Sequence, residues 1–158
     1  MKKLFLSTLV IIGLTVVSYA QNGTASATMQ SSLSFSETTA LNFGLLTIPT
    51  AASTVTIGAT DNRLFGSGDI ALIASATIVP KTGIFTITGQ ADANVSITVP
   101  ATIALTQGLS IGTSWNTGLV NLGPTGIAQL KIYGELSIPA TGVTSGAKTG
   151  TYTVTVNY

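Results

Sequence analysis

The sequence contains no cysteine and no histidine, and only 7% of its 158 residues are charged. Without cysteine, burial of apolar side chains and backbone pairing must hold the fold together. Ser–His and Cys–His nucleophilic pairs are excluded, and so are thiolate and imidazole metal ligands. Paired carboxylates for glycoside hydrolysis would need to lie within about 10 Å of each other, whereas the five acidic residues are scattered. We therefore expect no enzyme, no catalytic residue and no cofactor. The acidic residues are Glu37, Asp61, Asp69, Asp92 and Glu135.

Calcium is the one metal that such a chain could bind, because calcium takes oxygen ligands from loops. Asp61, Asn62 and Asp69 flank one turn-rich segment and could converge on an ion. Their spacing does not resemble an EF-hand, and Asp and Asn are ordinary turn formers. We expect no metal site.

Residues 1–20 have the layout of a secretory signal peptide. Lys2 and Lys3 precede an apolar run, and Ser18–Ala20 place small residues at the cleavage positions. The alternative is a membrane anchor, but a spanning helix needs about 20 apolar residues. We therefore predict export to the periplasm, cell surface or extracellular space, with membrane contact only through the signal peptide before cleavage.

Cleavage after Ala20 would remove Lys2 and Lys3 and leave four basic residues against five acidic ones, so the net charge would change from +1 to about −1. So few basic side chains cannot form the positive stripe on which binding to nucleic acid or anionic lipid depends. We expect neither as a partner.

The rest of the chain alternates apolar and polar side chains in short runs bounded by Gly, Pro, Asn or Asp, which is typical of β-strands. Within the last run, Gly134 falls in phase with the buried side chains and so predicts a bulge or the close approach of another strand. Residues 69–80 are more continuously apolar and predict a central strand covered on both faces. The alternating runs are residues 53–58, 83–89, 94–100 and 128–139.

Eight to ten short strands at about ten-residue spacing, with no helical periodicity, predict an all-β antiparallel sandwich or barrel. We favour an immunoglobulin-like β-sandwich. Residues 21–35 are either an N-terminal arm or a weak first strand, and residues 36–158 form the sandwich domain.

The chain ends on an alternating run, residues 150–158, in which four side chains share one face. That face must pack against the core, and the strand must pair with the N-terminal region or with another long strand. An open edge beside it would be a template for another chain. The candidate strand-pairing residues are Tyr152, Val154, Val156 and Tyr158.

Trp115 lies in a turn-rich stretch and allows two interpretations. An exposed indole could stack on a sugar ring, or the side chain could cover one end of the core. We favour the core interpretation.

Four segments in this order resemble the bacterial exported family known as domain of unknown function 4402. They are residues 41–49 (LNFGLLTIP), 85–106 (FTITGQADANVSITVPATIALT), 130–140 (LKIYGELSIPA) and 150–158 (GTYTVTVNY). The closing strand is shorter than the family pattern. Relatives of this kind are similar to fimbrial subunits and spore-coat-U-like proteins, which implies an immunoglobulin-like sandwich in a surface structure.

The resemblance implies further that the C-terminal strand lines a groove that receives a partner's strand, as it does in chaperone–usher pilins. The N-terminal arm here carries fewer bulky apolar residues than a pilin donor strand.

Two functional hypotheses remain. The first is an exported, non-enzymatic structural protein: a subunit of a bacterial surface filament, coat or adhesive layer, associating by β-strand pairing. Its partners would be other copies of itself or sibling surface subunits, with a periplasmic chaperone as a further partner. The alternative is a self-contained, monomeric secreted β-sandwich that binds glycans or other ligands.

Overall fold

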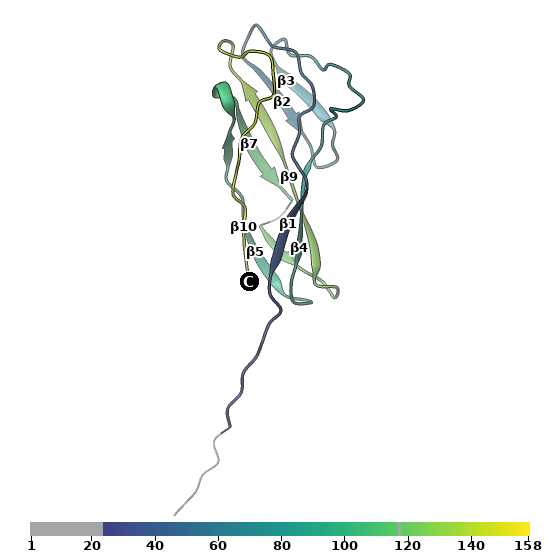
Figure 1. The fold of residues 1–158 in the computed structure, drawn as a ribbon, viewed down its shortest axis with the longest axis vertical. Helices are drawn as coiled ribbons and strands as arrows, with labels where there is room; N and C mark the ends of the chain where they lie inside the picture. The colour runs from purple at the N-terminus through teal and green to yellow at the C-terminus, as the bar shows by residue number, and fades with distance from the viewer. Residues whose placement is uncertain (1–23, 117) are drawn as a thin grey trace, which may run out of the picture.

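The computed structural model describes residues 24–116 and 118–158 and folds them as an immunoglobulin-like sandwich of antiparallel strands (Figure 1). The predicted signal peptide lies outside the described residues. No helix among the residues that are described has the length and apolarity that a membrane crossing requires. The elements are β1 (Ser34–Thr39), β2 (Ser53–Ile57), β3 (Arg63–Ser67), β4 (Gly83–Thr88), β5 (Asn94–Thr98), β6 (Thr102–Ala104), the 3-10 turn η1 (Thr106–Gly108), β7 (Ser110–Trp115), β8 (Leu119–Asn121), β9 (Ile127–Ile138) and β10 (Thr155–Asn157).

The long strand β9 is the centre of the larger sheet. Ile132 of β9 is opposite both Gly83 of β4 and Trp115 of β7, so β4 and β7 lie on opposite edges of β9. Leu136 is opposite both Val55 of β2 and Ile111 of β7, so β2 also lies opposite β7. Strands β4 and β2 therefore follow each other end to end along one edge of β9. Strand β1 extends the sheet beyond β4, and β3 extends it beyond β2.

A hydrogen-bonded junction joins β2 to β4. The Thr82 N–H donates to Asp61 Oδ1 at 2.6 Å, and the Thr82 hydroxyl donates to the Gly58 carbonyl at 2.8 Å. The Asp61 N–H donates in turn to the Thr82 hydroxyl at 3.3 Å. Thr82 is one of the few buried polar side chains, and these bonds satisfy it.

The smaller sheet has the order β10-β5-β8 and packs against the larger one. Buried side chains form two clusters, which we call lower and upper from their positions in Figure 1. The lower cluster is Phe85, Ile87, Val95, Ile97, Val99, Val120, Leu122, Leu130 and Ile132. The upper cluster is Phe43, Val55, Ile57, Ile70, Ile103, Leu109, Ile111, Leu136 and Ile138.

The four alternating runs are confirmed as β2, β4, β5 and β9, and the side chains on the predicted inward face of each strand are buried. The prediction for Gly134 is confirmed as a close approach, because a Cβ there would collide with the Gly112 carbonyl oxygen of β7. In contrast, the first strand, β1, begins at Ser34, and residues 24–33 form no strand.

The prediction that residues 69–80 form a central strand is wrong. Only Ile70 of its large apolar residues is buried, and Leu72 makes an isolated bridge to Leu46. Because β2, β4 and β7 already occupy both edges of β9, no central position is left for another strand. The run is an exposed loop, and continuous apolar character without periodicity could not distinguish the two cases. Its exposed apolar side chains are Leu72, Ile73, Ile78 and Val79.

Candidate assembly site

The C-terminal strand pairs within its own chain. In β10, Thr155 is opposite Thr98 and Val156 is opposite Ile97 of β5, so β5 and not the N-terminal region supplies the paired edge. Strand β10 is then the outer strand of the smaller sheet. Of the four candidate strand-pairing residues, Tyr152, Val154 and Val156 pack half-buried against the lower cluster, whereas Tyr158 is exposed.

Tyr158 instead holds the root of the N-terminal segment. Its hydroxyl donates to the Ser31 carbonyl at 2.8 Å and accepts from the Gln90 N–H, also at 2.8 Å. The Ser31 hydroxyl donates to Gln90 Oε1 at 3.2 Å. The last residue of the chain, the 89–92 turn and Ser31 are thus joined at the lower end of the sandwich.

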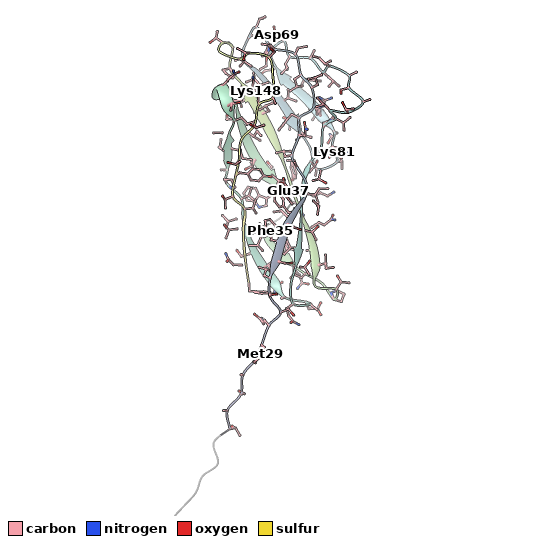
Figure 2. All side chains as sticks on the ribbon, in the orientation of Figure 1. Met29, Phe35, Glu37, Asp69, Lys81 and Lys148 are labelled. Atoms are coloured by element: carbon pink, nitrogen blue, oxygen red, sulfur yellow. The ribbon has the colours of Figure 1, made fainter. Side chains whose placement is uncertain are left out.

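Beyond this junction the chain leaves the domain. Residues Thr24–Ser32, which we call the arm, are exposed and extended and point away from the sandwich (Figures 1 and 2). Met29, near the middle of the arm, is 91% exposed. Within this domain, residues 24–33 form no strand, and β1 starts at Ser34.

The lower half of the sandwich is closed by side chains of β1 and of the C-terminal segment. Phe35 of β1 stacks on Phe85 with ring centroids 4.9 Å apart, and Tyr152 meets Phe85 edge-on at 6.2 Å. Aromatic pairs in these arrangements stabilise a core beyond the area that they bury. The outer strands of the two sheets meet here over the lower cluster.

The upper half is open. Residues 40–49, which continue from β1, and residues 143–152, which precede β10, form the two walls of a groove of about 1090 Å³. The upper cluster forms its floor, with Ile103, Ile111 and Leu136 exposed by 6% or less. Protein interiors have few voids larger than a water molecule, so a space of this size marks a missing packing element. Among the described residues that line it, Lys148 alone is charged.

The first wall is hydrogen-bonded on its outer side. The Ile73 N–H donates to the Leu45 carbonyl at 3.0 Å, and the Thr47 N–H donates to the Ala71 carbonyl at 2.9 Å. Successive residues of an extended segment direct their backbone groups to opposite sides. The N–H and carbonyl of Leu46 therefore point away from residues 71–73, and no backbone partner for them is found among the described residues.

The second wall is also held from outside. The Thr106 N–H donates to the Thr149 carbonyl at 3.2 Å, and Gln107 exchanges two side-chain hydrogen bonds with Thr144, at 2.8 and 2.9 Å. From Gly150 to Val154, no backbone hydrogen bond is present within the described part of the chain. Both groove walls thus contain backbone groups that have no strand partner among the described residues.

Tyr152 lines the groove and carries an unsatisfied group. Its hydroxyl is buried and has no hydrogen-bond partner among the described residues. Burial, with a smaller contribution from the negative charge of Glu37, raises the pKa of Tyr152 to about 12. A buried hydroxyl without a partner costs about 1–3 kcal/mol.

The acidic residues weighed for calcium are engaged in separate loops. The Thr50 hydroxyl and N–H donate to Asp69 at 2.6 and 3.0 Å, which lowers the pKa of Asp69 to about 2. The Thr82 N–H is the main cause that holds the pKa of Asp61 below its ordinary value. No group of three or more acidic residues that could hold a metal occurs in residues 24–116 and 118–158.

Trp115 is half-buried at the end of β7 and packs against the lower cluster. This position agrees with the interpretation that the indole covers core.

The fold and the groove define a class of protein: an immunoglobulin-like β-sandwich whose core is covered at one end and open at the other. Within that class, the chain belongs to the family described as domain of unknown function DUF4402, whose model matches residues 33–158. The match starts immediately after the arm. Comparison with curated proteins and with solved structures found no match.

The groove walls are the part of the candidate site that the sequence patterns did not predict. Residues 41–49 were noted as a family motif but not as a wall, although their dense apolar content without a full alternating pattern was a usable signal. Residues 143–149 are mostly small and polar and gave no signal.

Proposed function

We propose that this protein is an exported, non-enzymatic structural subunit of a bacterial surface filament, coat or adhesive layer, and that its copies associate by β-strand pairing. The observation that supports this most directly is the pair of facing groove walls without strand partners. A strand that entered between them would pair with backbone on both sides and cover the apolar floor. Strand addition to an exposed edge is a common mode of protein association.

The arrangement of the C-terminal segment favours the same role. Residues 143–152 form the second wall of the groove and lead directly into β10, the outer strand of the smaller sheet. The free edge of an outer strand is a template for another chain unless something covers it. A periplasmic chaperone would be a suitable temporary partner for such a groove before assembly.

A solution measurement tests this proposal. The exported protein, run on size exclusion with light scattering, should form oligomers that grow with concentration and persist in mild denaturant. A protein that stays monomeric up to the highest soluble concentration would contradict the proposal.

A binding module is the second candidate, and the groove itself favours it. Small-molecule pockets are mostly apolar and have volumes of about 300–1,000 Å³, close to the 1090 Å³ found here. A monomeric protein whose melting temperature rises with an added apolar or glycan ligand would support this alternative over the structural subunit.

A further inference from the structure

We propose that the groove between residues 40–49 and 143–152 is filled by the arm, Thr24–Ser32, of a second copy of this chain. This inference rests on the proposed function, because it specifies which segment pairs with which edge. The arm would lie between the two walls as an added strand.

The arm has the side-chain pattern of such a strand. Ala25, Ala27 and Met29 occupy alternate positions, separated by Ser and Thr, so an extended arm has an apolar face and a polar face. Nothing in its own domain covers the apolar face, since every residue of the arm is exposed. Short side chains at positions 25 and 27 also let the backbone approach both walls closely.

The described residues of the arm, 24–32, are too short to fill the groove of their own domain. Fully extended, these nine residues span about 30 Å at roughly 3.3 Å per residue. To reach the groove the arm would first have to double back along β1, whose six residues take up about 20 Å. The remaining length, less a turn, covers about the first three residues of a ten-residue wall. The far part, around Leu46 and Ile48, would stay uncovered.

The hydrogen bonds at the root of the arm also oppose its turning back along β1 toward the groove of its own domain. Tyr158 and Gln90 bind Ser31 from the lower end of the sandwich, so the chain leaves the domain pointing away from the groove (Figure 1). The arm is thereby presented to a neighbour.

The chemistry of the arm and groove agrees. The arm carries no charge, and the described part of the groove lining has a single charged residue, Lys148, so insertion removes almost no charge from water. An inserted backbone offers partners to the Leu46 N–H and carbonyl, for which no backbone partner is found among the described residues. A purely apolar ligand would leave these groups unsatisfied.

Two matched substitutions in the arm test the inference. Met29→Asp puts a charge on the apolar face, and Thr28→Asp puts the same charge on the polar face. Both positions are exposed, so neither change should alter the fold of the monomer. Burying a Met side chain contributes about 1.5–3 kcal/mol, and we therefore expect Met29→Asp to weaken association by about tenfold to a hundredfold. Thr28→Asp should change it by less than about threefold.

Cysteine cross-linking tests which groove is filled. The chain has no cysteine of its own, so introduced thiols can be read without interference. A mixture of Met29→Cys and Ala147→Cys single variants should form disulfide-linked heterodimers, because Ala147 is an exposed residue of the second wall. If the strand register instead places Ala25 or Ala27 beside Ala147, the variant with a cysteine at that arm position should form the disulfide with Ala147→Cys. A mixture with Ser96→Cys, exposed on β5, is the control and should give none.

The outcomes separate the two proposals. If no oligomer forms, the proposed function fails. If oligomers form but Met29→Asp and Thr28→Asp weaken them equally, and no arm cysteine links to Ala147 more than to Ser96, the inference fails while strand pairing by other edges stands. A disulfide within one chain of a Met29→Cys/Ala147→Cys double variant would likewise overturn it.

Discussion

Replacing Thr82 with Val should destabilise the whole domain, because it removes the hydroxyl that joins β2 to β4. The two side chains have nearly the same shape, so the change deletes hydrogen bonds without opening a cavity. The hydroxyl donates to the Gly58 carbonyl and accepts from the Asp61 N–H. Thr82 is 2% exposed, so water cannot easily replace these partners.

The expected loss in the free energy of unfolding is about 2 kcal/mol. A typical hydrogen bond contributes about 0.5–1.5 kcal/mol net, and a buried group left without a partner costs about 1–3 kcal/mol. With a urea slope of about 2 kcal/mol per molar, the unfolding midpoint should fall by about 1 M at unchanged slope. Urea titration followed by Trp115 fluorescence measures both quantities.

Thr82→Ser is the matched control, because it keeps the hydroxyl and loses one methyl group. It should retain at least half of the stability that Thr82→Val loses. The reasoning is refuted if Thr82→Val is as stable as the unchanged protein, or if the Ser variant is destabilised as strongly as the Val variant.

Four further predictions follow from single contacts. Gly134→Ala should destabilise the domain by about 1–3 kcal/mol in denaturant titration, because its Cβ would collide with the Gly112 carbonyl. Asp69 has its pKa lowered from 3.8 to about 2, so its contribution to stability is present above pH 3.8 and lost as the pH falls to 2. The melting temperature of the unchanged protein should therefore exceed that of Asp69→Asn at neutral pH, with a gap that closes over this window. Tyr152 has its pKa raised from 10.0 to about 12, so its contribution is complete below pH 10 and lost as the pH approaches 12. Over that window the unchanged protein should lose stability more steeply than Tyr152→Phe. Tyr158→Phe should cost about 1 kcal/mol and speed amide hydrogen exchange at Gln90, whose N–H loses its acceptor.

The strands that the sequence predicts well are those with one buried face. In β2, β4, β5 and β9, period-two alternation records burial directly, since one face meets the core and the other meets water. Gly134 could be predicted for a related reason, because a missing side chain in an apolar register implies a close neighbour. The error over residues 69–80 has the opposite origin. Apolar content alone does not say whether a partner strand exists, and here both edges of β9 are taken.

The candidate site could be predicted only in part. The C-terminal residues share a face, as their alternation indicates, but their pairing partner depends on the relative position of two sheets. The groove depends on an absence: in the part of the chain that the structure describes, no strand lies between residues 40–49 and 143–152. The gap arises because β1 ends at Thr39 and β10 begins only at Thr155, so neither strand extends beside the upper cluster. No local pattern in the sequence records it.

The division of the core explains how one domain could be stable alone and still gain from assembly. The lower cluster is closed by β1 and the C-terminal segment, whereas the upper cluster is the floor of the groove. Both clusters share β9, with Leu130 and Ile132 in the lower one and Leu136 and Ile138 in the upper one. An occupant of the groove therefore stabilises the same central strand on which the closed half depends. A ligand that binds only the folded state stabilises it in proportion to the logarithm of its free concentration over its dissociation constant. If the arm of a second copy is that ligand, the free energy of unfolding must rise with protein concentration, and Met29→Asp must remove the rise while leaving the value at high dilution unchanged.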